Sequence, residues 1–145
     1  MSDPRFVDPR GPRFGAWVTT GVLAAVLLTG SGLLLAVQTA VFLTGAVLGL
    51  RRAPYGVLFT ALVRPRLRPP TELEAEAPPR FAQAVGAGFA LVGTIGLLAG
   101  AETLGTTATV FALAAAFLNA AFGFCLGCEV YLLVRRTTTR EGAPA

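Results

Sequence analysis

Residues 14–50, FGAWVTTGVLAAVLLTGSGLLLAVQTAVFLTGAVLGL, decide the fold of this chain. The stretch is 37 residues long and contains no charged residue. A helix that crosses a membrane needs about 20 apolar residues, so this run is long enough for two such helices. Gly30-Ser31-Gly32 interrupts it near the middle, as expected of a tight turn. We therefore predict a hairpin of two membrane helices, at residues 14–30 and 33–50.

Two further uncharged runs follow, at residues 81–101 and 103–128, and they predict helices at 81–100 and 106–134. Charged residues make up only 14% of the chain, against about 25% in soluble proteins. We expect an all-α integral membrane protein, in which residues 14–136 form a bundle of four membrane-spanning helices. Residues 1–13 would be an irregular N-terminal arm, and residues 137–145 a disordered tail.

The arginines predict the orientation of this bundle. All 12 basic residues are arginine, and all lie within residues 1–13, 51–80 or 135–140. Cytoplasmic segments of membrane proteins carry an excess of Lys and Arg. We expect a plasma-membrane protein with both termini and the loop 51–80 in the cytoplasm. Arginines beside anionic lipid account for the basic charge, so a nucleic-acid partner is not expected.

The loop 51–80 divides into two parts. Residues 53–63 are apolar but too short to span a bilayer, which predicts an interfacial helix. Residues 64–80 contain five prolines and adjacent basic and acidic blocks, the composition of a stiff linker.

A weak internal repeat suggests that the bundle consists of two similar helical hairpins. Shifting the sequence by 67 residues aligns Pro12-Arg13-Phe14 with Pro79-Arg80-Phe81. The same shift pairs Leu58 with Cys125 and Ala61 with Cys128. If the two halves match, the fourth span ends near Ala121 and the cysteine pair lies at its cytoplasmic end. Otherwise the helix runs unbroken to Arg135 and the pair lies deeper in the membrane. Repeats of a helical unit are a known membrane architecture, and chance similarity within an apolar sequence is the alternative.

Cys125 and Cys128 are the only cysteines, and they form a C-x-x-C motif. The chain contains no His and no Lys, so imidazole and amine chemistry is excluded. Such a pair supports thiol–disulfide or persulfide exchange, in which the second cysteine resolves a mixed species. It also supports soft-metal binding, but two thiolates do not fill a tetrahedral site without a second subunit. The third interpretation treats both cysteines as small packing residues. We expect no metal and no cofactor, and a homo-oligomer stays open.

Glu129 stands one helical turn after Cys125. On an unbroken helix Cys125, Cys128 and Glu129 share one face, while Gly123 and Gly127 lie nearly opposite and would pack against another helix. A carboxylate at membrane depth suggests a proton carrier for the thiols. The alternative is that Glu129 only marks the point where the helix leaves the bilayer.

Three motifs resemble one family, the actinobacterial membrane proteins called domain of unknown function 4395. They are Asp8-Pro9-Arg10-Gly11-Pro12-Arg13-Phe14, Pro78-Pro79-Arg80-Phe81-Ala82-Gln83-Ala84-Val85-Gly86 and Leu118-Asn119-Ala120-Ala121-Phe122-Gly123-Phe124-Cys125-Leu126-Gly127-Cys128-Glu129. The resemblance covers about residues 5–136 and implies a small four-helix plasma-membrane protein with a Cys-x-Gly-Cys segment. It implies no established activity.

The leading functional hypothesis is exchange of thiols or sulfur at the cytoplasmic side of the membrane. Cys125 would be the nucleophile, Cys128 the resolving thiol and Glu129 the proton carrier. A cytosolic thioredoxin-like or rhodanese-like protein would be the partner. The alternative is a non-catalytic assembly or scaffold subunit of the membrane, in which the cysteines only pack.

Overall fold

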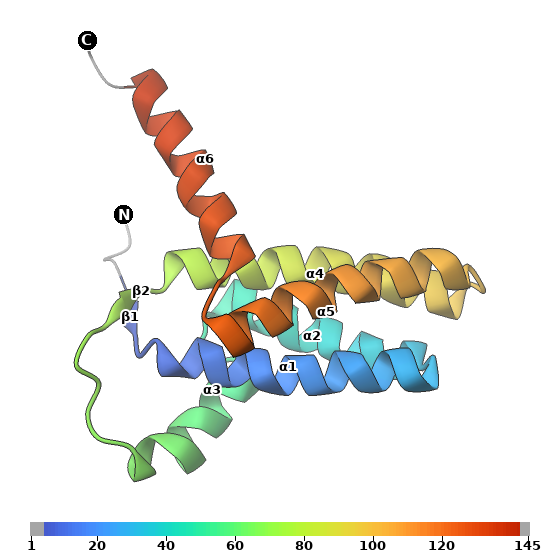
Figure 1. Cartoon of the computed structure of the whole chain (residues 1–145), viewed down its shortest axis with the longest axis horizontal. Helices are drawn as coiled ribbons and strands as arrows, with labels where there is room; N and C mark the ends of the chain where they lie inside the picture. The colour runs from blue at the N-terminus through green and yellow to red at the C-terminus, as the bar shows by residue number, and fades with distance from the viewer. Residues whose placement is uncertain (1–4, 143–145) are drawn as a thin grey trace.

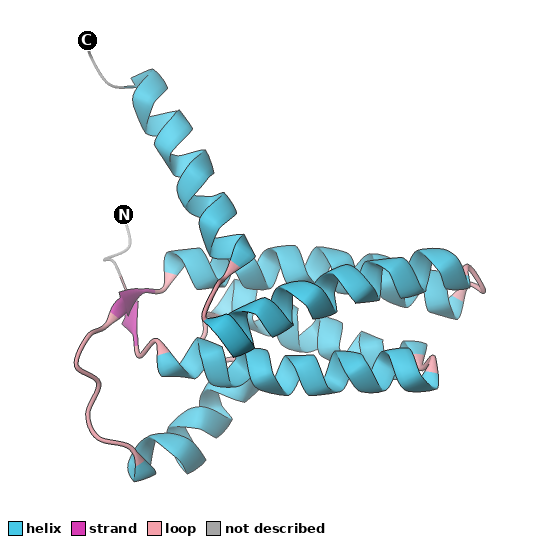
Figure 2. Ribbon diagram, in the orientation of Figure 1, coloured by secondary structure: helices cyan, strands magenta, loops and turns pink. Residues whose placement is uncertain are grey.

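The computed structural model describes residues 5–142, and most of them are helical (Figures 1 and 2). Four long helices lie alongside one another: α1 (Arg10–Thr29), α2 (Gly32–Leu48), α4 (Ala77–Leu98) and α5 (Glu102–Phe122). Helices α1, α4 and α5 are long and apolar enough to cross a membrane, and α2 is a shorter apolar helix of 17 residues. The predicted all-α class is confirmed.

The turn between α1 and α2 forms where the sequence predicts it. Gly30 adopts the left-handed conformation with φ of 68°, which costs glycine little, and its N–H donates to the carbonyl of Val26 at 2.7 Å. Ser31 then caps α2, because its Oγ accepts a hydrogen bond from the N–H of Leu34 at 3.1 Å.

The long helices are paired across the two halves of the chain. Helix α1 lies mainly against α5, α2 lies mainly against α4, and α4 also contacts α5. Seven apolar side chains from all four helices form the central core: Leu23, Val26, Leu35, Phe42, Ala87, Ala90 and Ala112. Helices α4 and α5 approach closely at Gly96, where an added Cβ would lie 2.7 Å from the backbone N of Gly105. Small residues permit this distance between helices.

Two arginines hold the C-terminal ends of helices from the opposite half. Arg13 on α1 donates from Nε to the carbonyl of Ala120 on α5 at 3.0 Å. Arg80 on α4 donates from Nε to the carbonyl of Ala46 on α2 at 2.7 Å. The last carbonyls of a helix have no partner within it and carry partial negative charge, so both contacts stabilise a helix end.

The loop after α2 contains the predicted helix, in an irregular form. Helix α3 (Pro54–Leu58) continues through a π-helical turn η1 (Phe59–Val63) into a 3₁₀ turn η2 (Arg64–Arg66). The chain then returns to a short strand β2 (Glu74–Ala75), which pairs antiparallel with β1 (Phe6–Val7). The N-terminal arm is therefore more ordered than predicted. It contains β1 and the first turn of α1, and residues 1–4 lie outside the described part.

The predicted continuous helix at 106–134 is wrong, and the structure agrees with the alternative in which the fourth long helix ends near Ala121. Helix α5 ends at Phe122, Gly123 takes φ of 68°, and a new helix α6 (Leu126–Gly142) leaves the bundle at a steep angle (Figure 1). The N–H of Gly123 donates to the carbonyl of Asn119 at 3.0 Å, which closes α5.

The prediction of a disordered tail at 137–145 is also wrong as far as Gly142, where α6 ends. Residues 143–145 lie outside the described part. The hydroxyl groups of Thr137, Thr138 and Thr139 donate to backbone carbonyls one turn earlier, so these polar residues bond within the helix.

Candidate functional site

Cys125 and Cys128 are joined by a disulfide bond, with their Cα atoms 5.1 Å apart. They lie at the junction between α5 and α6, at the end of the bundle where α1 and α4 begin (Figure 1). Both side chains are half-buried. The break at Gly123 thus removes the pair from the interior of a long helix and places it at a helix end.

Cys125 acts as the cap of α6. Its Sγ accepts a hydrogen bond from the N–H of Cys128 at 3.2 Å, and its carbonyl accepts from the N–H of Glu129 at 3.0 Å. A side-chain acceptor bonded to the third N–H of a helix is the usual arrangement of an N-cap, with sulfur here in place of oxygen. The sulfur of Cys125 therefore lies at the positive end of the α6 dipole.

Gly127 seats the first turn of α6 on α4. A Cβ at Gly127 would lie 2.6 Å from the Cα of Ala82, so only glycine fits without a shift. One turn later the rings of Tyr131 and Phe81 pack with centroids 5.7 Å apart.

The predicted packing seam of Gly123 and Gly127 is therefore half correct. Gly127 packs as expected, but a Cβ at Gly123 would meet nothing within 4 Å, and this glycine serves the turn. In a second motif of this spacing, Gly45-x-x-x-Gly49, Gly45 packs against Gln83, and Gly49 ends α2 with φ of 97° beside the carboxylate of Glu76.

Glu129 lies in the first turn of α6 and is exposed. The helical relation to Cys125 predicted from the sequence holds, because the bond from the N–H of Glu129 to the carbonyl of Cys125 closes one turn. A carboxylate in the first turn also stabilises the positive end of a helix. Both interpretations of Glu129 are consistent with this position.

An aromatic cluster lies on the surface of the bundle beside the disulfide. Trp17 on α1 packs edge-on against Phe117 on α5, and Phe117 packs edge-on against Phe122, with centroids 6.5 Å and 6.1 Å apart. Phe122 precedes Cys125 by three residues and is 71% exposed. Exposed aromatic side chains gather where membrane proteins meet the water interface.

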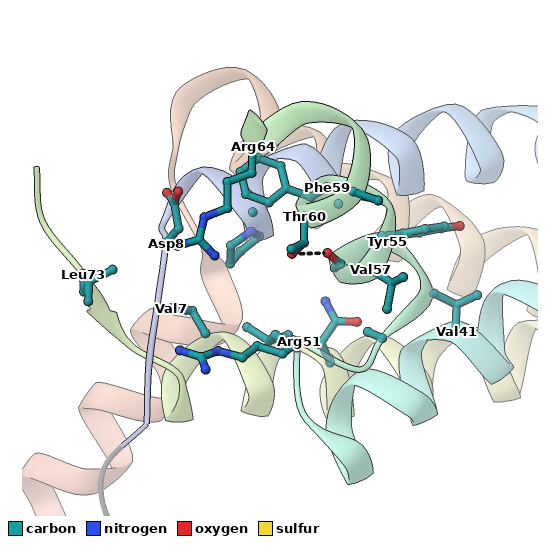
Figure 3. A pocket seen from close by; sticks show the side chains of 18 residues that line it. Val7, Asp8, Val41, Arg51, Tyr55, Val57, Phe59, Thr60, Arg64 and Leu73 are labelled. Atoms are coloured by element: carbon teal, nitrogen blue, oxygen red, sulfur yellow. Dashed lines mark hydrogen bonds between the residues drawn. The ribbon is translucent and has the colours of Figure 1, made fainter. Parts of the chain in front are cut away.

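Sequence reasoning missed a cavity of about 630 Å³ between the start of α1, the end of α2 and the segment α3–η1 (Figure 3). Tyr55, which lines the cavity, donates its hydroxyl hydrogen to Oε1 of Gln38 at 2.5 Å. Nε2 of Gln38 in turn donates to Oγ1 of Thr19 at 3.5 Å. Gln38 is only 1% exposed, and this contact gives its amide a partner within the core. Burial raises the pKa of Tyr55 above its usual value of 10.0.

Glu76 is a second feature that the sequence did not reveal. Its side chain is buried, and Oε1 accepts the N–H of Leu50 at 2.8 Å, just beyond the end of α2. The signal available was a carboxylate one residue before a helix that opens with Pro78 and Pro79. We interpret Glu76 as a structural residue that fixes the chain after α2.

Within residues 5–142 there is no group of three or more His, Cys, Asp or Glu side chains that would hold a metal ion. The Cys125–Cys128 disulfide is thus the chemically reactive feature on which the candidate site depends.

Comparison with known proteins gives one match. No curated protein and no solved structure matches the chain. The family model described as domain of unknown function DUF4395 matches residues 7–136, which includes the four long helices and the Cys125–Cys128 junction. This protein therefore belongs to the DUF4395 family.

Proposed function

We propose that this protein exchanges thiol–disulfide or persulfide equivalents at the cytoplasmic surface of the plasma membrane, with Cys125 as nucleophile. The observation that carries the proposal is the position of the Cys125 sulfur, which caps α6 and accepts the N–H of Cys128. A helix N-terminus stabilises a thiolate relative to a thiol, and the thiolate is the nucleophile in disulfide exchange.

The proposed exchange proceeds in two steps, each a thiolate attack on a disulfide. In the reduced protein the Cys125 thiolate attacks a partner disulfide, so a Cys125–partner bond forms and the second partner sulfur leaves as a thiolate that takes up a proton. The Cys128 thiolate then attacks Cys125, restores the intramolecular disulfide and releases the first partner sulfur. The partner gains two electrons and two protons, and the protein loses them. A cytosolic dithiol protein of the thioredoxin-like class returns the protein to its reduced form.

Glu129 has a defined part in this scheme. Its carboxylate is exposed and stands one turn from Cys125, where it would accept the proton that Cys128 loses before the second step. Glu129 forms no covalent bond to either reacting sulfur, so we expect it to affect the pH dependence of the exchange.

The distribution of arginines supports access to the disulfide from the cytoplasm. We propose that α1, α2, α4 and α5 all span the bilayer and that the end of the bundle bearing β1, α3 and the start of α6 faces the cytoplasm. The arginines belong to segments at this end, whereas residues 30–31 and 99–101 lie at the other end and contain none (Figure 1). The exposed aromatic cluster of Trp17, Phe117 and Phe122 would then lie at the cytoplasmic interface.

The paired contacts favour two repeated halves, each a hairpin followed by a shorter helix. Phe14 packs on Phe59 at 5.9 Å, as Phe81 packs on Tyr131 at 5.7 Å. Arg13 and Arg80 make the matching bonds to helix ends described above. In this repeat α6 corresponds to α3.

The contacts also change the register predicted for the cysteines. The N–H of Val57 donates to the carbonyl of Ala53 at 2.9 Å, as the N–H of Glu129 donates to that of Cys125. Ala53 therefore takes the position of Cys125, instead of Leu58 as the sequence alignment suggests. The reactive Cys125 of the second half would then occupy the position at which the first half has Ala53, an unreactive residue that precedes a helix.

A trapping experiment tests the exchange. A Cys128→Ser variant leaves Cys125 without its resolving thiol, so in cells it should accumulate a mixed disulfide with a cytosolic partner, visible on non-reducing gels and lost on reduction. A Cys125→Ser variant is the matched control and should trap much less. Equal trapping by both variants, or none by either, would contradict the proposal. In the absence of trapping, normal function of the doubly substituted protein would support the scaffold alternative.

A further inference from the structure

The cavity beside α3 has a charged end and an apolar body. It has a volume of about 630 Å³, well within the range of small-molecule sites and several times larger than an inorganic anion requires. In Figure 3 Arg51 and Arg64 lie toward one end of the cavity, and Val41 and Val57 lie toward the other.

The charge at this end favours an anion. Asp8 is the carboxylate among the lining residues, and it is already bonded to Arg10, whose NH2 donates to Oδ2 at 2.7 Å. Arg51 uses one donor on the carbonyl of Phe6 at 2.8 Å. Within residues 5–142 neither Arg51 nor Arg64 forms an ion pair, although Arg64 lies near enough to Asp8 for its charge to help lower the pKa of that carboxyl group. Both arginines retain donors that suit phosphate oxygens.

The apolar body suits an acyl chain. Phe59 forms part of the wall against Gly11 on α1, where an added Cβ would lie 3.3 Å from its ring. Val57 lines the cavity and is itself 52% exposed, so the apolar side of the cavity is continuous with the outer surface of α3. Leu58 and Leu62 extend this exposed apolar surface along α3 and η1, as expected of a segment at the lipid interface.

We propose that this cavity binds an anionic phospholipid, with the phosphate between Arg51 and Arg64 and part of an acyl chain along Val41, Val57 and Phe59. A neutral amphiphile would make no use of the positive charge of Arg51 and Arg64. Free phosphate would leave the apolar body empty. The proposal goes beyond thiol exchange and does not depend on it.

Thermal unfolding of the full chain in a neutral maltoside detergent tests the proposal. Dioleoyl phosphatidylglycerol should raise the unfolding midpoint with a saturable dependence, because a ligand that binds only the folded state stabilises it. Dioleoyl phosphatidylcholine and inorganic phosphate should have little effect. An Arg51→Gln/Arg64→Gln variant should weaken the apparent affinity for phosphatidylglycerol about tenfold or more.

Two further variants distinguish specific binding in the cavity from nonspecific attraction to the positive surface. Arg66→Gln removes an arginine of η2 that does not line the cavity, and it should bind phosphatidylglycerol as the wild type does. Ala61 lines the cavity, so Ala61→Phe should fill part of it without changing the charge and should also weaken binding. Equal effects of Arg66→Gln and the double variant, or equal stabilisation by phosphatidylcholine or by inorganic phosphate, would overturn the proposal.

Discussion

Gly123 decides the position of the candidate site, although it carries no side chain. Its φ of 68° turns the chain away from α5 so that Cys125 begins a new helix. An L-residue in the left-handed region pays for the contact between its Cβ and the next carbonyl. No neighbour lies within 4 Å of an added Cβ at Gly123. A substitution there would therefore cost backbone conformational energy without causing a clash.

We predict that Gly123→Ala lowers the free energy of unfolding by about 1–2 kcal/mol. Gly21→Ala is the control, because Gly21 is also free of neighbours but lies within α1 with ordinary helical φ. It should leave stability unchanged or raise it by up to about 1 kcal/mol. Unfolding in mixed detergent micelles measures both, and an equal response of the two variants would contradict the assignment of Gly123 as a turn residue.

A second prediction at this scale concerns Asp8 and pH. Hydrogen bonds from Arg10 lower the pKa of Asp8 below its usual 3.8. Because the native pKa is lower than the unfolded one, the pair stabilises the fold fully at neutral pH, and this contribution declines as the pH falls below about 3.8. Asp8→Asn should therefore be less stable than wild type at pH 7, and the difference should shrink by pH 3. A difference that stays constant over this range would exclude the ion pair as its cause.

At the scale of elements, α6 is attached to the bundle through its first two turns only. Gly127 contacts α4 at Ala82 and Tyr131 contacts Phe81, whereas most of the helix beyond Tyr131 is exposed. The orientation of α6 relative to the bundle therefore depends on this contact and on the turn at Gly123.

Gly127→Ala should loosen this attachment, because the added Cβ would lie 2.6 Å from a backbone atom and something must shift. We expect a loss of about 1–3 kcal/mol, typical of overpacking, although alanine is the better helix former. Limited trypsin digestion should then cut faster at Arg135 and Arg136. Gly88→Ala, on an open side of α4, should leave the digestion rate unchanged. Digestion at the wild-type rate in Gly127→Ala would refute the attachment.

The apolar runs predicted the long helices and the turn at Gly30, since length and the absence of charge suffice for these. They did not decide whether α5 ends near Ala121 or continues through the cysteines. Gly123-x-x-x-Gly127 is equally compatible with a packing seam and with a helix end followed by a new helix. The choice depends in part on Arg13, which binds the carbonyls of Ala120 and Ala121 from a position more than 100 residues earlier. The cysteine pair was visible as a motif, but its role as a helix cap required this long-range contact.

At the scale of the whole molecule, the segments that carry arginine lie at one end of the bundle and the arginine-free turns at the other (Figure 1). This separation predicts a topology that can be measured. Ser31→Cys and Arg66→Cys, each in a Cys125→Ser/Cys128→Ser background, report on the two ends.

A membrane-impermeant maleimide should label Ser31→Cys in intact cells, and Arg66→Cys only in inverted vesicles. The doubly substituted background without a new cysteine is the control and should stay unlabelled. Labelling of both positions from the same side would rule out the proposed four-span arrangement.

The bonds from Arg13 and Arg80 to helix ends in the opposite half have a consequence for biogenesis. Helix α1 is synthesised first, yet its main neighbour is α5, the last of the long helices. Helix α2 likewise waits for α4. We therefore expect the first hairpin to form before its main contacts with the second half exist. Arg13 reaches its carbonyls only after α5 has been made. The junction that carries the disulfide follows α5 in the chain, so Cys125 and Cys128 are synthesised only after all four long helices.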